Sequence, residues 1–397
     1  MNDLNLSYNL LVIGGGINGA AVARDAALRG MSVLLLEKAP TLAAGASSAS
    51  SKLAHGGLRY LETMQINVVK ESLRERNLLL ETCPAHVRPL RFIFPVFRNA
   101  KHSAWKVKMG LRLYDWLAAP SPLPEHQSLS YDALNKRYPN FNMEGFKGAF
   151  EYYDAQMDDR KLVELNAKSA SDLGADILTS VSDLAFLKND QGILTGATFT
   201  HDKRTHSIQA DVILNVTGAW SNQVLQKADP IARPIVQASK GVHLIAKTLH
   251  LKEAFILSTP QDNRTFFVMP YQGQTLIGTT DTPYHGDLDQ VLASEDDIRY
   301  LVNATQHYFP SFSASDVTST FAGLRPLIAK KASSMSAVSR DMEIDINRSG
   351  LISMVGGKYT SYRHMAEVCV DTIAKQLRDQ QKGLFKPCAT KTLRLPE

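Results

Sequence analysis

Residues 8–37 constrain the fold most, because this stretch combines two apolar runs with a glycine-rich turn and a helical pattern between them. Gly14, Gly16 and Gly19 have the spacing G-x-G-x-x-G. In that motif the first glycine permits a tight turn, the second lets backbone N–H groups approach a pyrophosphate, and the third lets the helix pack on the strand. The stretch therefore predicts a strand–helix–strand unit that binds a dinucleotide, with the pyrophosphate at the positive end of the helix.

Glu37 ends the second apolar run where a carboxylate bonds the ribose of adenosine, about 20 residues after the glycines. Gly15, Asn18 and Lys38 belong to the same unit, and we predict that they also contact the cofactor. The alternative interpretation, a purely structural glycine turn, does not explain why both strands, the helix and the terminal acid are in register.

The composition is that of an ordinary globular protein, with 44% hydrophobic and 21% charged residues. A length of 397 residues exceeds one usual core and favours two closely connected domains. The net charge of +5 suits an anionic ligand or an anionic membrane surface, whereas no basic cluster indicates nucleic-acid binding. The three cysteines are far apart and predict neither disulfides nor a metal site, which favours a reducing, cytoplasmic setting.

Neither a signal peptide nor a membrane-spanning helix is expected. Asp3 precedes the first apolar run, the positive segment of a signal peptide is missing, and glycines interrupt the run. Nowhere does the chain have about 18 consecutive apolar residues.

A loop rich in small residues occupies positions 42–62. Its serines suit a flexible linker, which is one interpretation. However, His55, Gly56 and Gly57 are followed by Arg59 and Tyr60, a mixture of permissive glycines, charge and an aromatic ring that a linker does not need. Such a loop allows the backbone to approach a flat ring closely.

Residues 97–117 read as an unusual amphipathic helix. Lys101, Lys108 and Arg112 recur at positions i, i+7 and i+11, and Trp105 and Trp116 lie on the neighbouring face. This pattern is typical of a helix in a membrane interface, with indoles at the headgroup level and cations over anionic lipid. A helix that covers the core and has a solvated basic edge explains it equally well.

The remaining pattern predicts an α/β protein with two domains. Helices are expected at residues 67–82, 158–174 and 360–378, and strands at 211–216 and 351–355, with largely antiparallel strands from 235 to 277. We assign residues 1–75, 150–234 and 325–397 to a discontinuous Rossmann-like domain and residues 76–149 and 235–324 to a substrate- and membrane-facing domain with an antiparallel sheet.

The second strand–glycine–helix element, with Gly356, Gly357 and Lys358, indicates which dinucleotide is bound. Two such elements on one sheet hold an extended, tightly retained cofactor between them, which favours FAD over NAD. The positive end of the last helix, together with Lys358, would then point at the pyrimidine edge of the flavin, where negative charge develops on reduction.

Three arginines predict a small anionic substrate. Arg59, Arg325 and Arg340 are each set among small or apolar residues. The planar guanidinium suits phosphate or carboxylate, although each of these arginines alone also fits a salt bridge or the surface.

Six segments in this order resemble the FAD-dependent glycerol-3-phosphate dehydrogenases, within the D-amino-acid oxidase-like flavoproteins. They are IGGGINGAAVARDAALRG, ASSASSKLAHGGLRYLE, IGTTD, GLRPL, SRD and GGKYTSYR, spread over nearly the whole chain. The resemblance implies oxidation of sn-glycerol 3-phosphate to dihydroxyacetone phosphate, with electrons passed to a membrane quinone. It also implies a peripheral position on the inner face of the cell membrane, and it leaves a homodimer open.

The resemblance also implies roles for single residues. Arg59, Tyr60, Arg325 and Arg340 would hold the phosphate, His243 and Lys358 would lie near the reacting hydroxyl, and Thr280 and Asp281 would line the same wall. With the dinucleotide unit above, the predicted FAD contacts are Ser47, Ser48, Ser51, Lys52, Leu53, His55, Gly56, Gly57, Thr217, Gly218, Trp220, Gly323, Arg325, Gly357, Lys358, Tyr359 and Thr360.

The implied chemistry moves a hydride from C2 of the substrate to flavin N5 while a base takes the hydroxyl proton. His243 is the natural base, because an imidazole titrates near working pH. A histidine satisfied within a strand remains an alternative. Lys358 could share the proton or stabilise the alkoxide and the reduced flavin.

Other functions stay open on the same scaffold. They are a glycerol-3-phosphate oxidase that uses O₂, an amino-acid or 2-hydroxy-acid oxidase, and a flavoprotein that has lost catalysis and serves as a binding module. Family members commonly continue as a helical C-terminal domain of about a hundred residues, a typical small-domain size. We expect that domain to be absent here, since the chain stops at Glu397.

Overall fold

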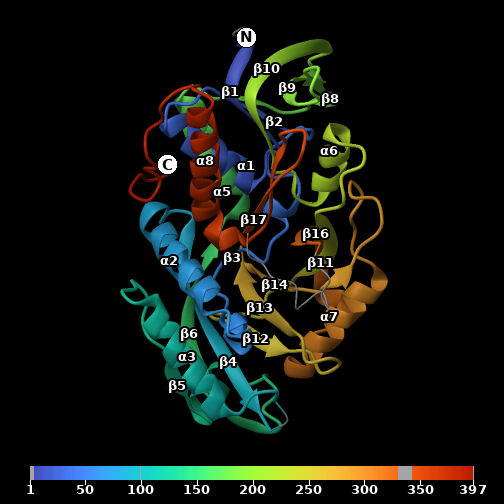
Figure 1. The fold of residues 1–397 in the computed structure, drawn as a ribbon. Coiled ribbons are helices and arrows are strands. Elements are labelled where there is room, and N and C mark those ends of the chain that lie inside the picture. Colours follow the sequence, from blue (N-terminus) through green and yellow to red (C-terminus); the bar gives the residue numbers. More distant parts are fainter. Residues whose placement is uncertain (1–3, 99, 330–341, 397) are drawn as a thin grey trace.

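The computed structural model describes residues 4–98, 100–329 and 342–396. The chain forms two sheets, each covered by helices, and the ribbon shows strands β1, β2 and β10 in one half of the molecule and β4, β6, β12 and β13 in the other (Figure 1). This arrangement confirms the predicted α/β class with a Rossmann-like part and a second sheet.

The first sheet is mainly parallel. β1 (Ser7–Ile13) is central and pairs in parallel with β2 (Val33–Leu36) and β10 (Arg204–Asn215). β7 (Asp176–Leu178) and β18 (Ile352–Gly356) extend it in parallel, while β17 (Met342–Ile346) and the β8 (Ser182–Lys188) and β9 (Leu194–His201) pair are antiparallel. All the parallel strands therefore end at the same edge, where a dinucleotide binds in folds of this kind.

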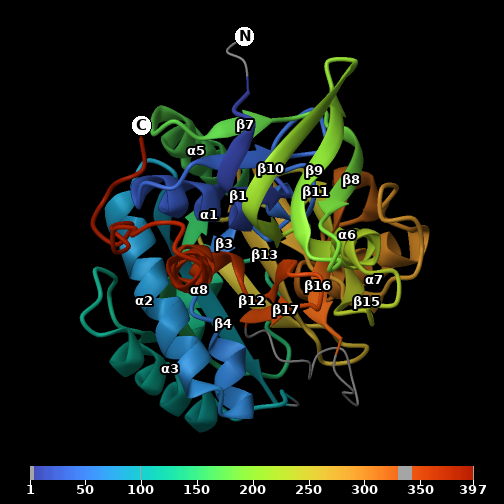
Figure 2. The same ribbon diagram turned by 45° about the horizontal axis from the view of Figure 1, so that its top comes forward.

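Alternate side chains of this sheet pack into two different hydrophobic clusters, one on each face. Leu10, Val12 and Leu35 pack with α1 (Ile17–Leu28), α5 (Asp159–Asp172) and α8 (Tyr362–Asp379). The second view shows these three helices on one side of β1 (Figure 2). Leu11 and Leu34 face the opposite side, where α6 (Ser221–Ala228) and the β8–β9 pair lie. Burial on both faces explains why these strands read as continuous apolar runs.

The second sheet is largely antiparallel, as predicted. Its order is β15 (Thr282–Pro283), β11 (Val236–Ala246), β14 (Gln274–Gly278), β13 (Thr265–Tyr271), β12 (Ala254–Ser258), β4 (Val87–Phe97), β6 (Phe146–Met157) and β3 (Leu53–Ala54). β16 (Val317–Ile328) pairs with β11, and β5 (Gln127–Leu129) with β6. Within the described ranges, β4 and β12 form the one parallel pair of this sheet.

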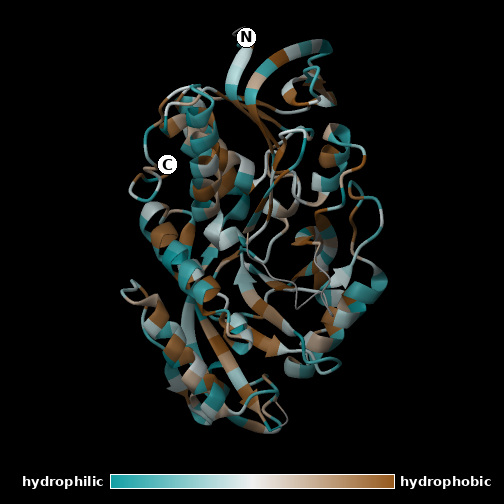
Figure 3. Ribbon diagram, in the orientation of Figure 1, coloured by the Kyte–Doolittle hydropathy of each residue, from teal (hydrophilic) through white to brown (hydrophobic). Residues whose placement is uncertain are grey.

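Two pairs of helices cover the second sheet. α2 (Ile66–Thr82) and α3 (Ala104–Ala118) pack on one face, and α4 (Tyr131–Arg137) and α7 (Glu295–Tyr308) pack on the other. Hydrophobic and hydrophilic residues alternate along α2 and α3, as expected for helices that cover a sheet (Figure 3).

The predicted element boundaries need three corrections. Residues 97, 98 and 100–103 are not helical, because β4 continues to Phe97 and the Ser103 hydroxyl accepts a hydrogen bond from Lys106 N at 3.4 Å as the cap of α3. β3 and β6 pair in the second sheet although they fall largely inside segments assigned to the first domain. The last helix begins with a 3₁₀ turn, Tyr359–Ser361, before α8.

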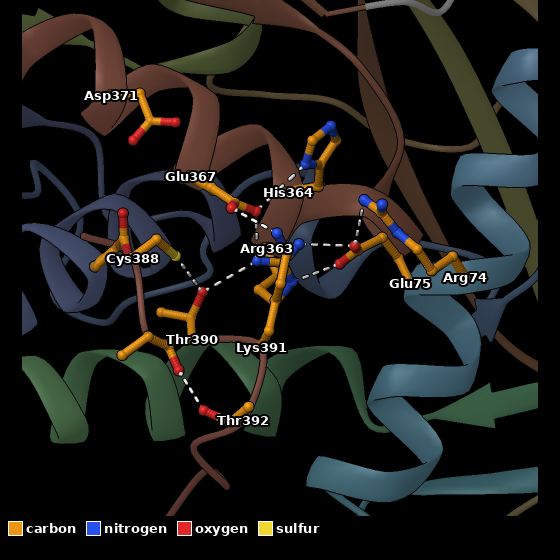
Figure 4. Close-up of polar contacts among 12 residues, drawn as sticks. Arg74, Glu75, Arg363, His364, Glu367, Asp371, Cys388, Thr390, Lys391 and Thr392 are labelled. Carbon is orange, nitrogen blue, oxygen red and sulfur yellow. Dashed lines mark hydrogen bonds and ion pairs between the residues drawn. The ribbon is translucent and has the colours of Figure 1, made fainter.

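A buried ion network ties the start of α8 to α2. Both carboxylate oxygens of Glu75 accept hydrogen bonds from the Arg363 guanidinium at 2.7 Å, and Arg363 also donates to Glu367 and to Thr390 of the C-terminal segment (Figure 4). Lys391, which belongs to the same C-terminal segment as Thr390, forms an ion pair with Glu367 of α8. This network holds the helix that follows Gly357 and Lys358 in one position.

Within the described ranges, no helix is both long enough and apolar enough to span a bilayer.

Candidate functional site

The glycine turn leaves no room for side chains. Gly14 has a φ of +116°, and a Cβ atom on Gly19 would lie 1.8 Å from the carbonyl oxygen of Gly14. A Cβ on Gly16 would lie 3.0 Å from Ser47 Oγ. The turn therefore presents bare backbone at the start of α1.

Side chains organise the N–H groups around this turn. Ser47 Oγ accepts a hydrogen bond from Ile17 N at 2.9 Å, and Glu37 Oε2 accepts one from Gly15 N at 2.7 Å. Gly16, the N-terminal capping residue of α1, gives no side-chain cap, and the first turn has no acidic residue. Asn18 lies half-buried in that turn. The helix end thus remains suited to an anion such as a pyrophosphate.

A second group of predicted cofactor residues gathers beside Glu37. Lys38 Nζ lies 4.5 Å from the centroid of the Trp220 ring and pairs with Asp289, which also accepts a hydrogen bond from Trp220 Nε1 at 2.9 Å. Thr217 and Gly218 precede Trp220, and Gly218 has a φ of +60°. Asp289 comes from the loop after β15, and no sequence motif indicated it.

The serine-rich segment is fixed by a buried ion pair. Lys52 Nζ lies 2.7 Å from Asp159 Oδ1, and it donates to the carbonyl oxygen of Ser48 at 2.7 Å. Ser50 also donates to Asp159. Gly323 of β16 lies so close to this segment that a Cβ atom on it would come within 2.8 Å of Ala49 Cβ.

The glycine loop, residues 55–60, follows Leu53 of β3 and is held on two sides. His55 N donates to Thr360 Oγ1 at 3.0 Å, and Gly56 N donates to the Tyr114 hydroxyl at 2.8 Å. Gly57 has a φ of +77°, which favours glycine at this position.

Lys358 lies directly beside this loop. Its Nζ is 3.9 Å from the centroid of the Tyr60 ring and 3.0 Å from Ser72 Oγ. The Arg59 guanidinium lies 5.1 Å from the same ring. The structure therefore brings Arg59, Tyr60 and Lys358 together, as the sequence predicted for a shared site.

A cavity of about 480 Å³ adjoins Lys358. This volume is in the usual range of small-molecule sites. Residues of α2, the end of β18, the start of α8 and the start of β17 line it, and they include Gln65, Glu71, Ser72, Met342, Gly357, Ser361, His364 and Met365.

His243 lies in β11, with only 2% of its surface exposed. Its Nε2 and Ser51 Oγ form a hydrogen bond of 2.8 Å, and its ring stacks on Phe321 with centroids 4.8 Å apart. Burial, together with the positive charges of Arg325 and Lys52, lowers the pKa of His243 from 6.5 to about 3. The ring is therefore neutral at pH 7.

The second ring nitrogen of His243 is buried and, among the described residues, has no hydrogen-bond partner. Buried polar atoms are nearly always paired, so an orphaned one at a predicted site points to a ligand that supplies the partner. A neutral imidazole in this position can accept a proton from such a ligand.

Arg325 is positioned by the wall that contains Thr280 and Asp281. Its guanidinium donates to the carbonyl oxygen of Thr280 at 3.1 Å and to Thr279 Oγ1 at 2.9 Å, and it lies 3.3 Å from Asp281 Oδ1. Thr280 Oγ1 in turn accepts a hydrogen bond from Val242 N, next to His243. Arg340, predicted for the same site, lies outside the described residues.

The predicted residues thus form two clusters, one with the segment that precedes β3 and one with the loop that follows it. His243, Arg325, Thr280 and Asp281 lie with Ser51 before the strand, and Arg59, Tyr60 and Lys358 lie with the glycine loop after it. Sequence reasoning missed the residues that hold these clusters, namely Ser72, Tyr114, Asp154, Asp159 and Phe321. Those residues have no motif of their own, because their partners are distant in the sequence.

Comparison with known proteins identifies the family and the fold. A protein-family model described as FAD dependent oxidoreductase matches residues 9–363. A glycerol-3-phosphate dehydrogenase of Synechocystis sp. is 36% identical over 418 residues, covering 99% of this chain and 74% of that protein. The aerobic glycerol-3-phosphate dehydrogenase of Bacillus subtilis is 36% identical over 394 residues, covering 98% of this chain and 70% of that protein.

Solved structures agree in fold. The glycerol-3-phosphate dehydrogenase from Bacillus halodurans complexed with FAD superimposes with a TM-score of 0.79 at 32% identity, covering 98% of this chain and 68% of that chain. The L-alpha-glycerophosphate oxidase of Mycoplasma pneumoniae has a TM-score of 0.72 at 19% identity, covering 98% of this chain and 99% of that chain, a likeness that concerns the fold alone.

Replacing Gly19 by alanine is expected to expel the dinucleotide, because the new methyl group meets the Gly14 carbonyl and forces the turn apart. Overpacking of this kind typically costs about 1–3 kcal/mol, which corresponds to a loss of affinity of about five- to 150-fold if the cost falls on the bound state. Bound FAD per chain, measured after gel filtration, tests this. Gly110→Ala is the matched control, since a Cβ atom there meets nothing within 4 Å. Equal FAD content in both variants would contradict the prediction.

The lowered pKa of His243 makes stability depend on pH. Between pH 3 and 6.5 the unfolded chain binds a proton that the folded chain does not, so the free energy of unfolding falls as the pH falls through this window, by up to about 1.4 kcal/mol per unit. His243→Gln is expected to flatten that dependence between pH 6.5 and 5, measured from urea unfolding. Replacing the exposed His285 in the same way should leave it unchanged, and identical slopes for all three proteins would refute the assignment.

Proposed function

The chain belongs to the FAD-dependent oxidoreductase family, so FAD is its cofactor, and we propose that it oxidises sn-glycerol 3-phosphate to dihydroxyacetone phosphate. The observation that carries the proposal is similarity at 36% identity, over 98–99% of this chain and 70–74% of the relatives, to proteins named for this substrate. The two cationic clusters beside β3 support it from the structure.

The residues present fit FAD. The bare turn at Gly14 and Gly19 and the uncapped start of α1 suit the pyrophosphate, and Glu37 lies beside the turn, where an adenosine ribose would reach its carboxylate. The glycine loop and Lys358 would lie against the ring system. FAD, when bound, accepts the hydride from C2 of the substrate.

The phosphate of the substrate would be held by the arginines. Arg59, in the loop after β3, and Arg325, in β16, carry the guanidinium groups, and Arg340 is proposed to join them. Charge-assisted hydrogen bonds are worth about 1.5–3 kcal/mol each, so two or three of them suit a phosphate dianion better than a single carboxylate. This favours a phosphate ester over an amino acid or a 2-hydroxy acid.

His243 would take the hydroxyl proton. Its ring is neutral, its orphaned Nδ1 is available to a ligand, and Ser51 and Phe321 hold the imidazole in one orientation. Lys358, beside the glycine loop, would stabilise the developing alkoxide. The substrate thus loses a proton to the chain and a hydride to the cofactor, which yields the ketone.

We further propose that the electrons leave to a membrane quinone at the inner face of the cell membrane. Support comes from α3, where Trp105 is 70% and Trp116 is 72% exposed, and where Met109, Lys106 and Arg112 are also exposed. Exposed indoles flanked by cations suit an interface with anionic lipid. Transfer to O₂ is the alternative, and turnover with a soluble quinone compared with oxygen uptake distinguishes the two acceptors.

An anaerobic titration with sn-glycerol 3-phosphate tests the substrate. We expect this ester to bleach the oxidised flavin band, whereas glycerol, lactate and D-alanine do not. Arg325→Ala should raise the substrate concentration for half-bleaching by about ten- to a hundredfold, the size of a lost charge-assisted hydrogen bond. Arg299→Ala, on the exposed face of α7, is the control. A yellow protein that none of these compounds bleaches would refute the proposed substrate.

Sedimentation with anionic phospholipid vesicles tests the membrane surface. Replacing Trp105 and Trp116 together by alanine is expected to weaken binding by about tenfold or more, because large apolar groups no longer enter the lipid. The control is Ile231→Ala, which removes an equally exposed apolar side chain from another surface. Unchanged binding, or the same loss in the control, would rule out α3 as the contact.

A further inference from the structure

We propose that Tyr114 is a positioning residue of the cofactor site, which acts with Asp154 to hold the glycine loop in the conformation that meets the flavin ring. The proposal rests on the placement of this loop against FAD in the proposed function, and it does not depend on the identity of the substrate. Neither residue belongs to the motifs that identify the site.

The contacts converge on one backbone group. Gly56 N donates to the Tyr114 hydroxyl at 2.8 Å and lies 3.3 Å from Asp154 Oδ1. The Tyr114 hydroxyl in turn lies 2.8 Å from each carboxylate oxygen of Asp154. Tyr114 therefore accepts from the loop and donates to the carboxylate, and one side chain links the two.

The opposite side of the loop is fixed as well. His55 N donates to Thr360 Oγ1 at 3.0 Å, and the Thr360 hydroxyl lies 3.2 Å from the carbonyl oxygen of His55. A Cβ atom on Gly56 would come within 2.4 Å of Leu73 and 2.6 Å of the Tyr114 hydroxyl. The loop is thus clamped between α3 behind it and the start of α8 beside it.

The charges in this network are balanced within the core. Arg76 is 1% exposed and donates to Asp154 at 2.8 Å. Burial and the charge of Asp154 hold the pKa of Tyr114 well above its usual range. The hydroxyl therefore keeps its proton at neutral pH and remains a donor to Asp154 while its oxygen accepts from Gly56.

A neighbouring tyrosine shows that the arrangement is specific. Tyr152 is also buried, and its ring meets that of Tyr114 edge to face with centroids 6.1 Å apart. Tyr114 is the one that bonds the loop, through Gly56. Since the two side chains share one environment, Tyr152 is a matched control for removal of a buried hydroxyl.

The test compares Tyr114→Phe with Tyr152→Phe. We expect the first variant to bind FAD about tenfold more weakly, the size of one lost buried hydrogen bond, and to shift the visible absorption bands of the bound flavin. The second variant should match the unaltered protein in FAD affinity and spectrum. Unchanged values for Tyr114→Phe, or equal losses in both variants, would overturn the proposal.

A second measurement needs no variant. In the unaltered protein with FAD bound, the amide hydrogen of Gly56 is expected to exchange with deuterium far more slowly than the amide of an exposed loop residue outside helices and strands, such as Glu125. Fast exchange at Gly56 would overturn the proposal. Both readouts are made without substrate, so their failure leaves the proposed substrate standing, and a failure of sn-glycerol 3-phosphate to bleach the flavin leaves the network standing.

Discussion

The buried ion pair between Lys52 and Asp159 is the interaction on which the site most depends, because it joins segments of both sheets. Lys52 immediately precedes β3 of the second sheet, and Asp159 begins α5 on the first. The carbonyl oxygen of Asp159 also accepts a hydrogen bond from Tyr359, next to Lys358. Removing one partner of such a pair would leave a buried charge, at a cost of about 3–5 kcal/mol. The serine-rich segment, the start of α5 and the start of α8 are therefore fixed relative to one another.

α3 has two faces with different tasks. Tyr114 points into the core and holds the glycine loop, whereas Trp105 and Trp116 are exposed on the same helix. Whatever covers the outer face therefore contacts the same helix that carries Tyr114. The proposed membrane contact and the proposed support of the cofactor site thus share one helix, α3.

The predictable part of the fold is the part with local signals. The spacing of Gly14, Gly16 and Gly19 and the buried stripe of α8 at Met365, Cys369, Ile373 and Leu377 follow from short-range sterics and helical periodicity. α7 also has a local signal, the capping box of Ser294 and Asp297, which could have revealed it. The contacts of Ser51 with His243 and of Lys52 with Asp159 join residues 192 and 107 positions apart. No sequence period encodes such pairs, because sheet pairing and domain packing create them.

The charges around His243 explain how a phosphate ester and a base could work together. Burial keeps the imidazole neutral, and Arg325 and Lys52 oppose its protonation further. In the proposed function, one of those cations, Arg325, holds the phosphate. A dianion at Arg325 would offset the positive charge that disfavours the imidazolium, so the pKa of His243 would rise when the substrate binds. The base would therefore gain proton affinity only in the complex that needs it, while the empty site keeps the ring neutral.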